Sequence, residues 1–96
     1  MFIVTSKWKP KEDQIDAWRE ATAKTREDLL QFPGVEMMYR YVNDEGDVIV
    51  IIGYADKATW SSLVEDPNGA VAQHMAANNI ETMADWISSD RGETVD

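Results

Sequence analysis

The single histidine of this sequence, His74, is the side chain that ordinarily titrates nearest neutral pH. It follows Val71 by three positions and stands beside Met75, so in a helix it shares the apolar side. An imidazole there can face a cavity and act as a general base or hydrogen-bond a bound molecule. It can equally be a partly buried histidine that bonds a backbone carbonyl. The sequence leaves both interpretations open.

Aromatic and sulfur-containing side chains form a second set of candidates. Four tryptophans fall in four separate segments of the chain. Aromatic side chains contribute strongly to burial in a core, at an interface or around a ligand, and methionine adds adaptable apolar volume. Trp18 fits the buried stripe of a helix, so we interpret it as structural. The candidates for contact with a ligand are Trp60, Trp86, Tyr54 and Met75.

Motifs that hold nucleotides, metals or activated nucleophiles are absent. The sequence contains no P-loop, no GxGxxG, no GxSxG and no HExxH. With one histidine and no cysteine, it argues against a transition-metal site and excludes disulfides and thiolate chemistry. We therefore expect neither a metal nor a cofactor.

The net charge of −9 results from 18 acidic and 9 basic residues. Nucleic acids and anionic membranes select basic surfaces, so we expect neither as a partner. The acidic residues are scattered, which favours a solvated surface or a saline habitat, with a cationic partner as the alternative. No apolar run approaches the ~20 residues of a membrane helix and no signal peptide is evident, so a cytoplasmic protein is expected.

The order of hydrophobic periods predicts one domain over residues 1–96. Alternating or continuous apolar runs indicate strands at 2–8, 35–42, 48–52 and 80–87. Helical spacing lies between the first two runs and between the last two. The order β-α-β-β-α-β is that of the ferredoxin-like α+β fold, a four-stranded antiparallel sheet with both helices on one face. The other face must be covered, which predicts a homodimer.

Residue types mark where the first helix begins and which side it buries. Pro10 ends the first strand, and Glu12 and Asp13 are expected in the first helical turn, where carboxylates favour the helix dipole. The buried stripe is expected to contain Ile15, Trp18, Thr22, Thr25, Leu29 and Phe32.

Later boundaries follow from turn and capping residues. Residues 43–47 are expected to form a hairpin loop with Gly46 at positive φ. Asp56 is expected to cap a short helix, and Pro67 to occupy the first position of the next. Residues 88–96 are polar and are expected to form a mobile tail.

Two segments resemble a known family. Residues 53–78 read GYADKATWSSLVEDPNGAVAQHMAAN, and residues 32–35 read FPGV. Both resemble the corresponding parts of antibiotic biosynthesis monooxygenase-like proteins, and in element order the resemblance covers nearly the whole chain. It implies a dimeric α/β barrel, in which two sheets pack through their bare faces.

The resemblance also implies where a site would lie. Catalytic members often use an asparagine on the first strand, a tryptophan in the second helical region, and a histidine or tyrosine further on. His74 matches the last of these. Thr5 or Ser6 stands where the asparagine is expected and Leu63 where the tryptophan is expected, which argues against heme degradation. Leu63 thereby joins the residues expected to contact a substrate.

Two functions of different classes follow. The leading hypothesis is a cofactor-independent monooxygenase acting on a small, apolar, phenolic or quinol-type substrate. His74 would accept the hydroxyl proton, and Trp60 and Trp86 would hold the ring and exclude water. The alternative is a non-catalytic small-ligand-binding or interaction protein on the same scaffold. Fold alone does not choose between them.

Overall fold

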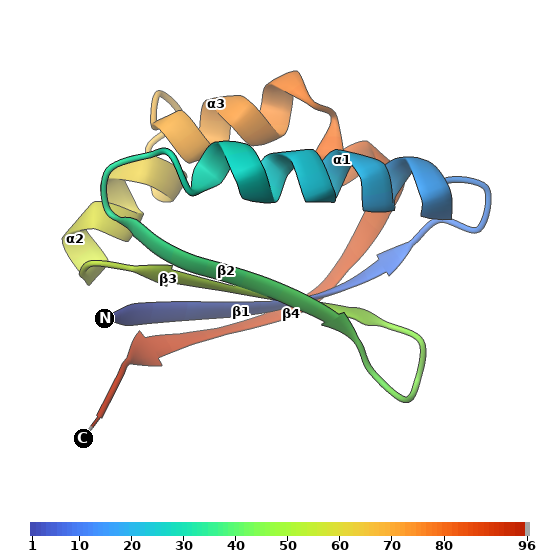
Figure 1. Ribbon diagram of the computed structural model, residues 1–96, viewed down its shortest axis with the longest axis horizontal. Helices are drawn as coiled ribbons and strands as arrows, with labels where there is room; N and C mark the ends of the chain where they lie inside the picture. Colours follow the sequence, from blue (N-terminus) through green and yellow to red (C-terminus); the bar gives the residue numbers. More distant parts are fainter. Residues whose placement is uncertain (96) are drawn as a thin grey trace.

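A four-stranded antiparallel sheet carries helices on one of its faces (Figure 1). The computed structural model describes residues 1–95, and its strand order is β2-β3-β1-β4. The strands are β1 (Phe2–Pro10), β2 (Val35–Val42), β3 (Val48–Tyr54) and β4 (Ala84–Glu93). The helices are α1 (Ile15–Leu29), α2 (Lys57–Trp60), the π-helical turn η1 (Ser61–Glu65), α3 (Ala70–Ala77) and α4 (Ile80–Met83). The predicted ferredoxin-like α+β fold is confirmed.

The two most apolar strands lie at the centre of the sheet. β1 pairs with both β3 and β4, while β2 occupies an edge beside β3. A hairpin loop joins β2 to β3, and the side chain of Asn43 accepts hydrogen bonds from the backbone nitrogens of Glu45 and Asp47 at 3.0 and 2.9 Å. Gly46 has a φ of 86°, which is the conformation that glycine adopts most easily. The predicted loop is confirmed, as are the positions of the second and third strands along the chain.

Helix α1 buries the middle of the predicted stripe, whereas Ile15 in its first turn is exposed and Phe32 lies beyond its end and is partly buried. Trp18, Thr22, Thr25 and Leu29 are buried, but Ile15 is 38% exposed. The helix begins at Ile15 after a turn over residues 12–14, so Glu12 and Asp13 precede it. Placing those carboxylates in the first helical turn was therefore wrong. Ile15 is the first residue of the helix and lies beyond the edge of the core. For this reason the helical spacing of the sequence did not predict that Ile15 would be exposed.

The second helical region begins as predicted but continues differently. The carboxylate of Asp56 accepts a hydrogen bond from the backbone nitrogen of Thr59 at 2.7 Å. Hydrogen bonding from the side chain of Thr59 and from this backbone nitrogen lowers the pKa of Asp56. Pro67 is not the first residue of a helix, because residues 66–69 form a turn and α3 starts at Ala70. Asp66 closes that turn by accepting from the backbone nitrogen of Asn68 at 2.9 Å.

The last strand lies later in the chain than predicted. Ile80–Met83 forms α4, and the strand runs over Ala84–Glu93. The expected mobile tail is wrong for residues 88–93, which pair with β1 as far as Phe2 opposite Glu93. Backbone pairing at a sheet edge requires no apolar side chains, so a polar sequence can complete it. Asp96 lies outside the described residues.

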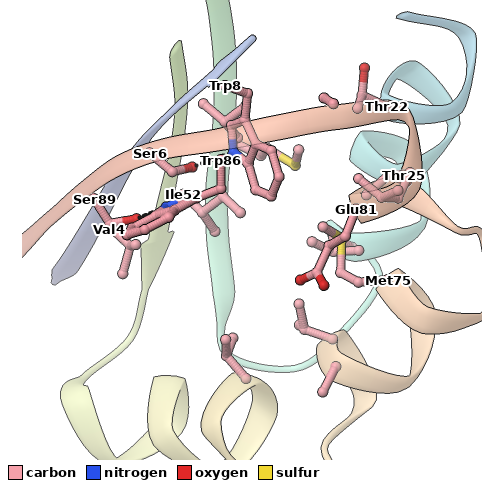
Figure 2. Close-up of a pocket in the computed structure, with 18 of the residues that line it drawn as sticks. Val4, Ser6, Trp8, Thr22, Thr25, Ile52, Met75, Glu81, Trp86 and Ser89 are labelled. Atoms are coloured by element: carbon pink, nitrogen blue, oxygen red, sulfur yellow. Dashed lines mark hydrogen bonds between the residues drawn. The ribbon is translucent and has the colours of Figure 1, made fainter. Parts of the chain in front are cut away.

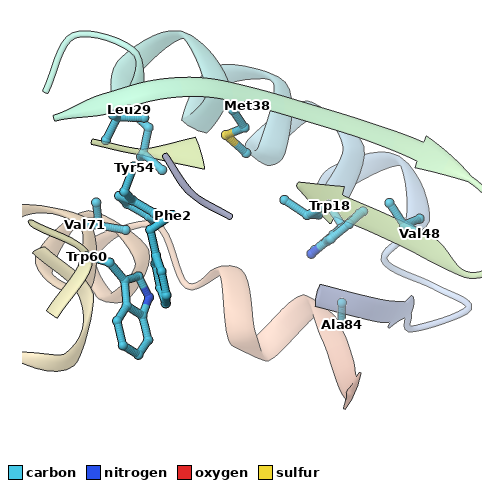
Figure 3. Packing of buried hydrophobic residues seen from close by; sticks show 11 residues of the cluster. Phe2, Trp18, Leu29, Met38, Val48, Tyr54, Trp60, Val71 and Ala84 are labelled. Atoms are coloured by element: carbon cyan, nitrogen blue, oxygen red, sulfur yellow. The ribbon is translucent and has the colours of Figure 1, made fainter. Parts of the chain in front are cut away.

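The core fills the space between the helices and the sheet (Figure 3). Phe2 packs on Trp60 with ring centroids 5.2 Å apart, and Trp18 and Leu29 of α1 are almost fully buried. Within residues 1–95, no helix covers the opposite face of the sheet, and Tyr39 and Tyr41 on β2 are 58% and 53% exposed. None of the helices within residues 1–95 is long and apolar enough to cross a membrane.

Candidate functional site

A cavity of about 820 Å³ lies between the sheet and the helices (Figure 2). Its walls come from β1 and β3, from α1 and α3, and from the start of β4. β1 contributes Val4, Ser6 and Trp8, because alternate residues of a strand point to the same face. Most lining side chains are aliphatic or aromatic, so the cavity suits a mainly apolar molecule.

Two serines hold the indoles on the β4 side of this cavity. Trp8 Nε1 donates to Ser6 Oγ at 2.9 Å, and Trp86 Nε1 donates to Ser89 Oγ at 2.8 Å. Trp8 and Trp86 are direct partners across the β1–β4 pair. Trp86 is 59% exposed, so it stands at the open rim of the cavity (Figure 2).

Four of the six residues singled out in the sequence line the cavity. They are Trp60, Trp86, Tyr54 and Met75. Leu63 belongs to η1 and packs against the core without lining the cavity. His74 is not among the residues that line the cavity either.

His74 lies between α3 and α1. Its Nε2 is 3.1 Å from Thr25 Oγ1, and its Nδ1 is 4.0 Å from the carboxylate of Asp28. With the ring proton on Nδ1, facing Asp28, Nε2 accepts from the Thr25 hydroxyl and from the Asn78 amide, which is 3.4 Å away. The ring of Phe32 stands nearly perpendicular to the imidazole, with centroids 6.3 Å apart.

Thr25 connects His74 to the cavity. It is buried and lines the cavity, while its hydroxyl contacts the imidazole. The sequence pointed to Thr25 only as part of a buried helical stripe. A threonine in such a stripe is a polar group that needs a partner, and this signal could have linked it to the one histidine.

Tyr54 ends β3 at the cavity wall and is almost completely buried. Burial raises the pKa of its hydroxyl from 10.0 to about 12, because the phenolate would lose its hydration. The hydroxyl is therefore protonated throughout the neutral range and is available as a hydrogen-bond donor.

We expect the protein to lose stability between about pH 10 and pH 12 because of Tyr54. The folded-state pKa is raised, so the contribution is fully present below pH 10 and is lost as the unfolded chain releases this proton first. A shift of this size corresponds to about 2–3 kcal/mol by pH 12. Urea unfolding across this range should show a flatter decline for Tyr54→Phe than for the wild type.

Within residues 1–95, no group of three or more histidine, aspartate or glutamate side chains is arranged to hold a metal ion. Two acids, Glu81 and Asp85, are among the residues that line the cavity, and Figure 2 shows Glu81 near Met75 and Thr25. The polar side-chain groups that line the cavity are thus hydroxyls, indole nitrogens and carboxylates.

Several solved structures have the same fold as this protein. A crystal structure of an antibiotic biosynthesis monooxygenase superposes with a TM-score of 0.70 at 17% identity, with full coverage of both chains. Rv0793 from Mycobacterium tuberculosis gives 0.78 at 12% identity, covering 99% of this chain and 95% of that one. NE2512 from Nitrosomonas europaea, a protein of unknown function, gives 0.74 at 17% identity, covering 99% and 89%.

These structural similarities confirm the resemblance at the level of the fold. Sequence identities this low support a shared fold and nothing further. No protein-family model matches the chain, and no curated protein matches it in sequence. The similar structures include proteins named monooxygenases and proteins of unknown function. The chemistry must therefore be argued from the cavity itself.

Proposed function

We propose that the cavity binds a small, mainly apolar ring compound of the phenolic or quinol type and oxygenates it without a cofactor. The observation that carries the proposal is the cavity itself, about 820 Å³ in volume and walled by aromatic and aliphatic side chains. Trp60 and Trp86 are suited to hold a ring, and Met75 adapts to its outline. Such a site excludes water from a reactive intermediate.

The reaction begins with loss of a proton from the hydroxyl of the bound compound. Thr25 Oγ1 accepts this proton as its own hydrogen passes to Nε2 of His74, and Asp28 favours the resulting imidazolium. His74 thus acts through Thr25, which supplies the contact with the cavity that the imidazole lacks. The neutral hydroxyl of Tyr54 can donate to the oxygen of the ring compound.

The electron-rich phenolate then reacts with molecular oxygen. In the enol form of an anthrone, the O–H bond and the C–H bond of the ring carbon opposite it break, and a C=O bond forms at that carbon. One oxygen atom enters the carbonyl and the other leaves as water with both hydrogens. The ring compound supplies all four electrons that reduce the oxygen molecule, so no further reductant is required.

A carrier or sensor of the same ring compounds is the second candidate. The position of His74 outside the cavity wall favours this second candidate, because a side chain that acts directly on the substrate as a general base would line the cavity. In addition, Leu63 stands where catalytic members of the family have a tryptophan, and Leu63 does not line the cavity. Both functions use the same binding site and differ only in turnover.

Oxygen uptake separates these two functions. Anthrones and hydroquinones are screened with an oxygen electrode, and binding of each is measured in parallel by tryptophan fluorescence. Uptake above the uncatalysed rate, with formation of the carbonyl product, supports the oxygenase. Tight binding with no uptake by any compound supports the carrier, and absence of binding contradicts both.

We also propose that the protein is a homodimer formed through the bare face of the sheet. Ile49, Ile51, Tyr39 and Tyr41 lie on that face, where β2 and β3 pair. Apolar side chains gathered on one surface favour association with a second copy. The expected cytoplasmic location stays a prediction.

Sedimentation is expected to give twice the mass of the chain at micromolar concentration. Ile51→Lys, which places a charge in the middle of the face, is expected to yield a monomer. Glu45→Lys in the β2–β3 loop is the matched control and should leave the dimer intact. A wild-type protein that sediments as a stable monomer would contradict the proposal.

A further inference from the structure

The carboxylate of Glu81 lines the cavity without a partner of opposite charge. Glu81 belongs to α4, and Figure 2 shows its carboxylate turned toward the space that the drawn side chains surround. The ion pairs found within residues 1–95 join the N-terminus to Glu93 and His74 to Asp28, so neither involves Glu81. A carboxylate at the wall of a mainly apolar cavity is stabilised when a bound cation offsets its charge.

The rest of the cavity wall adds negative charge and no positive charge. Asp85 also lines the cavity, and within the described chain no lysine, arginine or histidine is among the lining residues. Lys9 is the partner of Asp85 across the β1–β4 pair and offsets part of its charge, but Lys9 lies outside the cavity wall. The guanidinium of Arg91 lies over the ring of Trp60, 4.8 Å from its centroid, and does not line the cavity either. The potential inside the cavity therefore favours a cation.

The indoles on the β4 side of the cavity offer a second kind of contact for a cation. The faces of tryptophan rings attract cations more strongly than those of the other aromatic side chains. Trp86 is 59% exposed at the open rim, and Trp8 is its partner across the two strands. Both indole nitrogens already donate to serines, so the ring faces are what these two residues offer to a charged group.

We propose that the ring compound bound in the cavity carries an amine on a short side arm, and that Glu81 binds the resulting ammonium group. The inference rests on the proposed binding of a ring compound and narrows its chemical class. The ammonium group donates to the carboxylate of Glu81, while the indole of Trp86 supplies a cation–π contact at the rim.

A positive charge on the ligand also assists the proposed reaction. Thr25 accepts the hydroxyl proton in that reaction, and Figure 2 shows Glu81 near Thr25. A phenolate that forms beside an unpaired carboxylate is disfavoured by repulsion between the two negative charges. An ammonium group between them offsets this repulsion, so the ligand itself supplies the positive charge that the cavity wall lacks.

Three naphthalenes of similar size test the inference. 2-(Aminomethyl)naphthalene is positively charged at neutral pH, 2-(hydroxymethyl)naphthalene is uncharged, and 2-naphthoate is negatively charged. None of them is a phenol, so binding is measured without turnover. Isothermal titration calorimetry of the wild-type protein gives the three dissociation constants at low and at high salt.

The amine is expected to bind about three- to tenfold more tightly than the alcohol at low salt, and 2-naphthoate is expected to bind most weakly. The preference for the amine should shrink at high salt, because dissolved ions screen a carboxylate that is exposed to solvent. The affinity for the alcohol should change little with salt.

Glu81→Gln keeps the shape of the side chain and removes its charge. In this variant, the affinity for the amine is expected to fall about three- to tenfold, close to that for the alcohol, while the affinity for the alcohol stays the same. Glu45→Gln is the matched control, because it removes the same charge from the β2–β3 loop, outside the cavity wall. It should keep the wild-type preference.

The outcomes separate this inference from the proposed function. Binding of the alcohol without any preference for the amine would overturn the inference and leave the proposed ring site intact. Equal loss of the preference in Glu81→Gln and Glu45→Gln would assign it to the net charge of the protein and overturn the role of Glu81. Failure of all three compounds to bind would contradict the ring site itself.

Discussion

The His74→Ala variant is expected to consume oxygen with its best phenolic substrate at about one hundredth of the wild-type rate or less. The imidazole accepts the proton passed on by Thr25, because its Nε2 lies 3.1 Å from that hydroxyl. Initial rates in an oxygen electrode, at equal concentrations of folded protein, measure the effect. Because His74 packs between two helices, the variant is also expected to lose about 1–2 kcal/mol of stability. Urea curves must therefore accompany the rates.

Two further variants test the route of the proton. Thr25→Val keeps the shape of the side chain but removes the hydroxyl, so it should lower the rate nearly as much as His74→Ala. Asn78→Ala removes a neighbour of the imidazole that lies outside the route and should leave most of the rate. Full activity in Thr25→Val would contradict the relay. A wild-type protein without turnover, combined with a large stability loss in His74→Ala, would assign His74 a structural role only.

The Trp18→Ala variant is expected to lose about 3–5 kcal/mol of unfolding free energy. Trp18 is 1% exposed and packs between α1 and the sheet, so truncation removes a large buried surface and enlarges the cavity. Urea melts of the wild type and the variant give the difference. For a chain of this length, such a loss is a large part of the total stability.

Ile15→Ala is the matched control for this substitution. Ile15 lies three residues earlier on the same helix but is 38% exposed, so its truncation should cost well below about 1 kcal/mol. A loss below about 1 kcal/mol for Trp18→Ala would mean that the indole contributes little to the core. Similar losses for both variants would point to a general weakening of α1.

Local periodicity predicted most of the fold, and its failures are instructive. The stripe of α1 was predicted at Trp18, Thr22, Thr25 and Leu29 because helical spacing is a property of neighbouring residues. The last segment was misread, because four residues from Ile80 alternate in a way that fits either a strand or one helical turn. Residues 88–93 were taken for a tail because edge pairing depends on backbone groups that leave no mark in the sequence.

The candidate site was predicted in part for a similar reason. Trp60, Trp86, Tyr54 and Met75 could be chosen because large apolar side chains near the helices tend to surround whatever space is left. The position of His74 could not be predicted from the sequence. One side of α3 faces both α1 and the cavity, and the helical spacing does not say which of the two a residue on that side meets. Only the crossing of the two helices decides that it meets Thr25. Trp18 was interpreted as a core residue, and the structure places it both in the core and in the wall of the cavity.

Because this short chain has a cavity of about 820 Å³, binding of a ligand can be detected through its effect on the unfolding equilibrium. A molecule that binds only the folded protein stabilises it by mass action, by about 2.7 kcal/mol at one hundred times its dissociation constant. In a domain of this size each kcal/mol raises the melting temperature by roughly 4–8 °C. A compound library can therefore be sorted by melting temperature before any reaction is known. The ranking is the same whether the protein transforms its ligand or only carries it.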